Sequence, residues 1–311
     1  MHFENEIQKF KLYLLLEKKQ PSTIKRYTYD VQLYKDWLKN DSEATGVPHC
    51  WPYINELPSY YSYLRGSGSY SPNTIRRILS ALRKWFQYIQ QPDAVCILEH
   101  YLKETKVCRT LDDVYLAPNQ IKQLFNSLAS NRGLTEKQKK YRHLIRDRNE
   151  VIFRLILFYG VTIQELTTLH LNRIHFASKE VELTGRKGKS RILTLHANDI
   201  KKMYACYMTI PEPVRPNRYD AVPYFLAFNY QLGTYRENKG LSEVAVQKMI
   251  RHEIKRAGLP KHFTAQALRK TYILHQLTKG KKKETLRDEL AFETTQPLDE
   301  LEKWAKGLKS L

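Results

Sequence analysis

The chain has few of the features that mark secreted, membrane-spanning or metal-binding proteins. Its cysteines, Cys50, Cys96, Cys108 and Cys206, lie far apart, and none shares a CxxC spacing. No run of about 18 apolar residues occurs, and no positively charged start leads into an apolar segment. No His, Cys, Asp or Glu cluster has metal-ligand spacing, and no glycine-rich phosphate loop is present. We therefore expect reduced thiols, a cytoplasmic location, no membrane partner, no metal and no cofactor.

Acidic residues are scarce relative to basic ones. The 311 residues contain 52 Lys and Arg against 32 Asp and Glu, which gives a formal net charge of +20. Residues 1–110 hold 16 basic and 11 acidic residues, and residues 111–311 hold 36 and 21, so both parts are basic. Such an excess exceeds what solubility requires and indicates a polyanionic partner, with nucleic acid as the first candidate.

The N-terminal part has the periodicity of packed helices. Apolar residues recur at three- and four-residue steps from Pro21 to Leu38, and Ser71-Pro72 supplies an N-cap followed by a proline at the first helical position. The second helix has one apolar face, made by Ile75, Ile78, Leu79, Leu82, Trp85, Phe86 and Ile89. Its other face carries Arg76, Arg77, Arg83 and Lys84, with no acid among them. We expect phosphate contacts there and at Lys25 and Arg26 of the first helix, with an ordinary solvated surface as the alternative.

The pattern loosens between Gln91 and Ala117, which suggests a domain boundary. We predict a helical DNA-binding domain at 1–105, a linker at 106–116 and a second domain at 117–311. In the second domain, residues 148–170 form an apolar core helix broken at Gly160, and two strands at 180–184 and 191–195 form a hairpin. The hairpin carries Arg186, Lys187, Lys189 and Arg191. The rest is predicted as helices joined by loops, so the fold is mainly α with a small antiparallel β-hairpin.

Four segments in order resemble motifs of the tyrosine recombinase family, which includes phage integrases and Xer proteins. Residues 160–166 (GVTIQEL) are similar to the family's GLRxSEL box, and the hairpin is similar to its GKGxKxR segment. Residues 263–272 (FTAQALRKTY) resemble the TPHxLRHT box, and residues 290–295 (LAFETT) fall where the family has LGHxxxxTT. Each match alone is weak, but four in order are specific. The resemblance covers nearly the whole chain and implies two domains, the first a SAM-like core-binding domain, closing around duplex DNA.

The resemblance also shows where this chain departs from the family, whose catalysis uses a tyrosine, two arginines, a histidine and a hairpin lysine. The corresponding positions hold Thr162, Gln266, Phe292 and, near the expected nucleophile, Leu301, and no tyrosine follows Tyr272. Losing charge and proton-transfer groups removes transition-state stabilisation. We therefore predict that the chain is not an enzyme. Arg269, Lys270 and the hairpin cations can still bind a ground-state phosphate, although a structural salt bridge is the alternative for Arg269.

These observations predict a sequence-specific, double-stranded DNA-binding protein that represses transcription, similar to the integrase-like lysogeny repressors of SPβ-type phages. The alternatives are an active recombinase or integrase, an accessory or architectural DNA-binding protein, and a non-specific binder. The segment 298–304 either docks on a neighbouring protomer, which would make a homo-oligomer on DNA, or folds back on its own domain. A protein or peptide antagonist stays open as a further partner.

Overall fold

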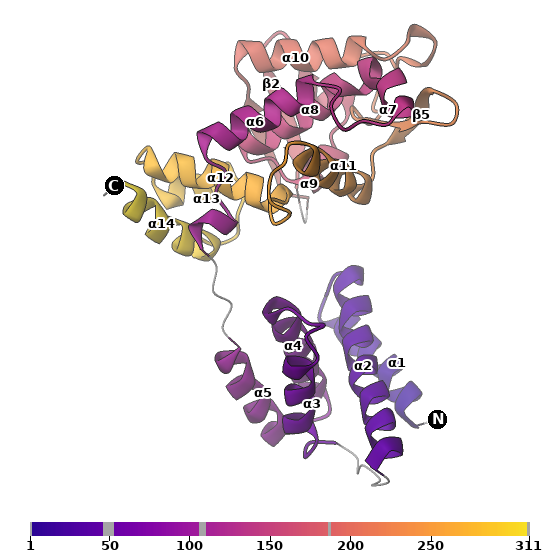
Figure 1. Ribbon diagram of the computed structural model, residues 1–311, viewed down its shortest axis with the longest axis vertical. Helices are drawn as coiled ribbons and strands as arrows, with labels where there is room; N and C mark the ends of the chain where they lie inside the picture. Colours follow the sequence, from indigo (N-terminus) through magenta and orange to yellow (C-terminus); the bar gives the residue numbers. More distant parts are fainter. Residues whose placement is uncertain (1, 46–52, 106–109, 186–187, 310–311) are drawn as a thin grey trace. The chain divides into compact units, whose positions relative to one another are not determined.

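The computed structural model describes residues 2–45, 53–105, 110–185 and 188–309. The chain divides into two compact units, Met1–Cys108 and Arg109–Leu311 (Figure 1). The end of the predicted linker belongs to the second unit, where Val114 and Leu116 are buried. The backbone N–H of Leu116 donates to the hydroxyl of Thr271 at 3.0 Å. Because this contact ties residue 116 to a helix far along the chain, the second domain begins before the predicted residue 117.

The first unit is a bundle of helices. Its elements are α1 (His2–Leu16), α2 (Pro21–Thr45), α3 (Leu57–Gly66), α4 (Pro72–Tyr88) and α5 (Pro92–Glu104). Helix α4 begins as predicted, with the Ser71 hydroxyl accepting a hydrogen bond from the N–H of Thr74. The apolar face of α4 packs into the bundle core, where Leu82 and Phe86 are fully buried. Helix α2 starts at the predicted Pro21 and continues past Leu38 to Thr45.

The second unit combines helices with two small sheets. Its helices are α6 (Pro118–Ala129), α7 (Glu136–Lys140), α8 (Arg142–Tyr159), α9 (Ile163–Thr167), α10 (Ala197–Met208), α11 (Glu243–Arg256), α12 (Ala265–Thr278), α13 (Lys283–Glu289) and α14 (Gln296–Lys309), with 3₁₀ turns at Leu111–Asp113, Leu171–Arg173 and Glu212–Val214. Figure 1 shows α8 between α10 and α12, and it contacts both. As the apolar pattern predicts, α8 lies in the core and stops before Gly160, which caps its C-terminal end at φ +64°.

The strands form one expected hairpin and one that was not predicted. Strands β1 (Ile174–His175), β2 (Glu180–Thr184) and β3 (Ser190–Thr194) make an antiparallel sheet in that order, with Leu183 opposite Arg191. Strands β4 (Leu226–Asn229) and β5 (Thr234–Gly240) pair elsewhere, so the prediction of helices and loops there was wrong. Their turn depends on Gly233 at φ +71° and on Asn229, whose side chain accepts from the N–H of Gln231. Both are local turn signals that the sequence contained.

The C-terminal helix folds back on its own domain. Helix α14 packs against α12, and Leu298, Leu301 and Ala305 are buried there beside Ile273. The apolar face of α14 is thus covered within the chain, and docking on a neighbouring protomer stays a prediction. Among the described residues, no helix combines the length and the apolar character needed to cross a bilayer.

Candidate nucleic-acid interface

The cations of α4 contact other helices of the bundle. Lys84 pairs with Glu17, directly after α1, at 2.6 Å, and Arg83 pairs with Glu99 of α5 at 3.2 Å. The remaining contacts join Arg77 to Asp30 at 3.0 Å, and Arg76 to the backbone carbonyls of Leu102 and Thr105. No acid lies among these cations within α4, but acids from elsewhere in the bundle pair with Arg77, Arg83 and Lys84. Phosphate contact by these side chains stays a prediction.

Asp30, the partner of Arg77, is a buried carboxylate. Its side chain is 0% exposed, and only Arg77 donates to its Oδ1 among the described residues. Burial raises the pKa of Asp30, and the nearby charge of Arg77 offsets part of that rise. Arg77 is thus held between α2 and α4. By contrast, Lys25 and Arg26 lie exposed on α2, where the Arg26 guanidinium sits 5.7 Å from the ring centre of Tyr29.

The hairpin cations differ in their surroundings. Arg186 and Lys187 lie outside the described residues, and Lys189 is exposed directly before β3. Arg191 is only 9% exposed and pairs with Glu165, with Nε donating to Oε1 at 2.7 Å. Its Nη1 donates to the Glu289 carbonyl at 3.0 Å. Arg191 therefore links β3 to α9 and to the C-terminal segment, and its contact with DNA stays a prediction.

Thr162, which stands where the resemblance places the first arginine, caps helix α9. Its hydroxyl accepts from the N–H of Glu165 at 3.2 Å and donates to the Glu165 carboxylate at 2.9 Å. Burial would raise the pKa of Glu165, but hydrogen bonds and charge from Arg191, together with the Thr162 contacts, outweigh it and lower that pKa. A threonine here completes a capping box and so has a structural role.

Arg269 occupies a different environment from Arg191. Its Nε donates to the Gly160 carbonyl at 2.8 Å, its Nη2 lies 3.4 Å from the Leu290 carbonyl, and its guanidinium carbon is 4.7 Å from the ring centre of Phe292. Burial lowers the pKa of Arg269 to about 10, so the side chain stays charged near pH 7. Among the described residues, no carboxylate lies within ion-pairing distance of it. The salt-bridge alternative is therefore not what the structure shows for this arginine.

The remaining positions singled out by the resemblance do not all gather at Arg269. Gln266 is exposed one turn before it on α12, and Lys270, which follows it, is partly buried. Leu301 is 2% exposed in the α12–α14 core. A side chain at position 301 thus faces the protein interior in this arrangement. Within the described ranges, no group of three or more His, Cys, Asp or Glu side chains is placed to hold a metal ion.

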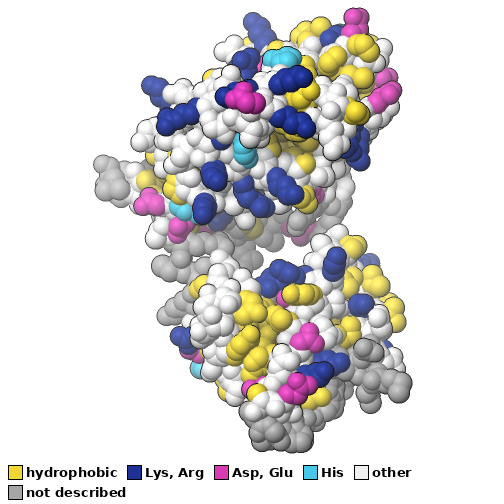
Figure 2. Space-filling model, turned by 45° about the vertical axis from the view of Figure 1, so that its right-hand side comes forward, with side chains coloured by type: hydrophobic (Ala, Val, Ile, Leu, Met, Phe, Trp, Pro, Cys, Tyr) yellow, Lys and Arg dark blue, Asp and Glu magenta, His cyan; other side chains and the backbone are white. Residues whose placement is uncertain are grey.

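A cationic stripe on α11 was missed by the sequence analysis. Lys248, Arg251 and Lys255 are exposed and spaced by three and four residues, so they share one face of the helix. None of them makes an ion pair with a described residue, and Arg251 only approaches Gln247, at 3.5 Å. Figure 2 shows Lys and Arg side chains outnumbering acidic ones on the visible face of the second unit. The spacing was readable in the sequence, but its exposure required the fold.

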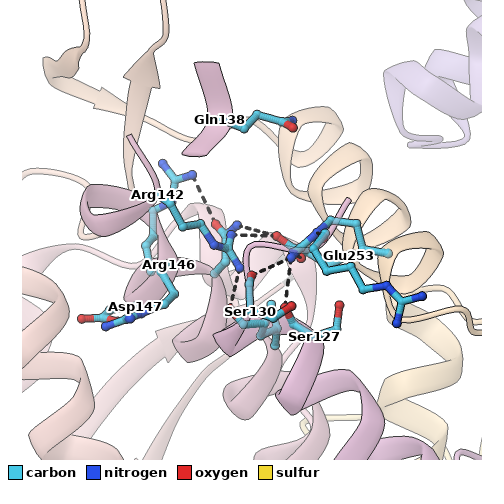
Figure 3. A network of polar contacts seen from close by, with 12 residues as sticks. Ser127, Ser130, Gln138, Arg142, Arg146, Asp147 and Glu253 are labelled. Atoms are coloured by element: carbon cyan, nitrogen blue, oxygen red, sulfur yellow. Dashed lines mark hydrogen bonds and ion pairs between the residues drawn. The ribbon is translucent and has the colours of Figure 1, made fainter. Parts of the chain in front are cut away.

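A buried ionic network joins α11 to α8 and to the end of α6 (Figure 3). Glu253, on the inner face of α11, accepts from Arg142 at 3.1 Å and from Asn149 at 3.2 Å, both on α8, and pairs with Arg256. Arg142 also donates to the Leu128 carbonyl at 2.6 Å, at the end of α6. Because a buried carboxylate needs its cations, the network fixes the rotation of α11 about its axis.

Comparisons with known proteins agree with this architecture. Residues 7–93 match the model of the phage integrase N-terminal SAM-like domain. The chain is 25% identical over 197 residues to the TnP I resolvase of Bacillus thuringiensis, covering 61% of this chain and 62% of that relative, which is less than two thirds of its length. It is 22% identical over 283 residues to tyrosine recombinase XerC of Rickettsia canadensis (strain McKiel), covering 88% of this chain and 84% of that protein.

A solved structure shows the same fold. The chain is similar to the integrase of transposon Tn1549 in complex with circular intermediate DNA, with a TM-score of 0.62, 14% identity, and coverage of 95% of this chain and 94% of that one. The prediction that the chain is not an enzyme is contradicted, because these relatives are named as a resolvase, a recombinase and an integrase, which are enzymes. The N-terminal domain match, the curated relatives and the shared fold all point to proteins named as tyrosine recombinases and integrases, to which this chain is similar.

Proposed function

We propose that the chain binds double-stranded DNA at a specific sequence, with the second unit holding the phosphate backbone. The observation that carries this proposal is Arg269, a partly buried cation without a carboxylate partner among the described residues. A buried charge is costly unless an anion compensates it. Glu165 pairs directly with Arg191 and acts on Arg269 only as a nearby charge, so Arg269 keeps the capacity to bind a DNA phosphate.

We further propose that α11 contributes to recognition. Its outer face offers Lys248, Arg251 and Lys255 along one stripe, and the 14-residue helix has a width that the major groove of duplex DNA accepts. Lysines and arginines on such a face contact phosphates, and an arginine can also reach guanine edges. The exposed Lys189 of the hairpin would add a phosphate contact on the same unit.

For the biological role we propose transcriptional repression by operator occupancy in the cytoplasm of a bacterial host, as in phage lysogeny. The supporting observation is that three positions singled out by the family resemblance have structural contacts in this chain. Thr162 caps a helix, Phe292 lies over the guanidinium of Arg269, and Leu301 is buried in the core. Occupancy requires cations and donors, which the described residues provide. Site-specific recombination is the second candidate, and the enzymes named among the relatives favour it.

DNA selection tests the binding proposal. Fragments of the source genome retained by the protein should share one sequence, and footprinting should protect it. We expect affinity for that site to exceed affinity for random duplex by about 10³-fold or more at physiological salt. Equal affinity for both would overturn sequence-specific binding.

A variant pair tests the α11 stripe. Replacing Lys248 and Arg251 with alanine should reduce the slope of log affinity against log salt by about two units, because each phosphate contact contributes about 0.9. The matched control is Lys122→Ala with Lys201→Ala, which removes the same charge from exposed positions on α6 and α10 that also make no ion pair with a described residue. Equal changes in both double variants would show that only overall charge matters and would contradict a defined contact at α11.

A nicked suicide substrate separates the two roles. A covalent adduct that survives denaturant would establish recombinase chemistry, since the family attaches its protein to DNA through a side chain. Loss of expression from a reporter placed behind the selected site, without any adduct, would support repression. Both assays use the full chain with the same selected duplex.

A further inference from the structure

Three backbone carbonyls surround two guanidinium groups at the centre of the second unit. The Gly160 carbonyl accepts from Arg269 at 2.8 Å and lies 3.5 Å from Nη2 of Arg191. The consecutive carbonyls of Glu289 and Leu290 accept from Arg191 at 3.0 Å and from Arg269 at 3.4 Å. These neutral oxygens occupy donors that could otherwise bind a negatively charged oxygen.

The segment Glu289–Phe292 also packs an aromatic ring against the guanidinium of Arg269. Phe292 follows Leu290 by two residues, and its ring centre lies 4.7 Å from the guanidinium carbon. A ring face at this distance attracts the cation and keeps water from that side. Within Glu289–Phe292, the Leu290 carbonyl and the Phe292 ring therefore contact Arg269, and the Glu289 carbonyl contacts Arg191.

This segment is held by contacts at both ends. The N–H of Phe292 donates to the Arg287 carbonyl at 2.8 Å, and Lys281 pairs with the Glu289 carboxylate at 2.8 Å. Leu290 is buried in the core that α12 shares with α14. Ala291, between Leu290 and Phe292, adopts φ +53°, a conformation that costs an alanine energy and that an opened segment would relieve.

We propose that Glu289–Phe292 is an internal cap that competes with a DNA phosphate for Arg269 and moves aside when DNA binds. The proposal rests on the proposed function for the identity of the ligand. A phosphate oxygen makes a charge-assisted bond to the guanidinium, stronger than the bond to the Leu290 carbonyl, so it can displace the cap. The observed contacts leave Nη1 of Arg269 without an acceptor among the described residues, which gives the phosphate a first point of attachment.

Chemical modification tests the cap without DNA. Phenylglyoxal reacts with accessible arginines, and mass spectrometry of the digested full chain gives the rate at Arg269, with the exposed Arg251 as an internal standard. Phe292→Ala and Phe292→Leu should raise the Arg269 rate several-fold, whereas Phe292→Tyr, which keeps the ring, should leave it near the wild-type rate. The leucine variant retains apolar volume, so agreement between Leu and Ala assigns the effect to the ring. Equal rates in all four proteins would overturn the cap.

Duplex binding tests the competition. Phe292→Leu should bind the selected duplex about 3- to 30-fold more tightly than wild type, the range expected for losing a cation–ring contact from the unbound state. Adding Arg269→Ala should abolish this gain. Increased phenylglyoxal reactivity with unchanged DNA affinity would overturn the competition. If wild type binds no duplex at all, the proposed function fails, while the modification rates still decide whether the cap exists.

Discussion

Replacing Gly160 with alanine should destabilise the second unit far more than the same change at Gly188. Both glycines have positive φ, +64° and +73°, so alanine is strained at either position. The surroundings differ. A Cβ on Gly160 would lie 2.7 Å from Cδ1 of Tyr272 and 2.9 Å from Cδ2 of Leu290, whereas nothing lies within 4 Å of a Cβ on Gly188.

The magnitudes follow from these two contributions. The left-handed conformation costs alanine about 1–2 kcal/mol at either site. Overpacking a filled core adds about 1–3 kcal/mol, and only at Gly160. We therefore expect Gly160→Ala to lower the free energy of unfolding by about 2–5 kcal/mol and Gly188→Ala by about 1–2 kcal/mol.

Urea unfolding followed by circular dichroism measures both losses, and hydrogen exchange of peptides from α8 and α12 assigns them to the second unit. The Gly160 carbonyl also accepts from Arg191 and Arg269, so exchange should increase in the segments that carry these arginines. Equal losses in the two variants, or none at Gly160, would refute the close packing of Tyr272 against this turn.

Two further predictions concern the ion pair at α9 and the docking of α14. Glu165→Ala should cost about 3–5 kcal/mol, because it leaves the buried Arg191 without its carboxylate. The folded pKa of Glu165 lies below its ordinary 4.5, so the stability that this carboxylate contributes is present above about pH 4.5 and is lost as the pH falls through the folded pKa. The variant Glu165→Gln should therefore flatten that part of an acid unfolding curve. Leu301→Ala should cost about 2–5 kcal/mol at every protein concentration, as expected for burial within one chain. A loss that depends on concentration would instead indicate docking between chains.

The candidate site was predictable where its signals are local. The break at Gly160, the hairpin and the position of Arg269 all follow from short segments, and the structure keeps them close together. The cations of α4 were interpreted as unpaired because their acids are remote, as with Lys84 and Glu17, which are 67 residues apart. Sequence periodicity shows which face of a helix is polar, but it does not show which residues from elsewhere cover that face.

The sequence by itself determined a basic chain, the main helices and the resemblance to recombinase motifs, because charge, periodicity and capping act over a few residues. Only the tertiary structure decided that Arg191 pairs with Glu165 while Arg269 donates to backbone carbonyls. It also decided that α14 packs on α12 and that the α11 cations are exposed without an ion pair to a described residue. These outcomes depend on contacts between residues far apart in the chain, where burial and pairing fix the state of each charge.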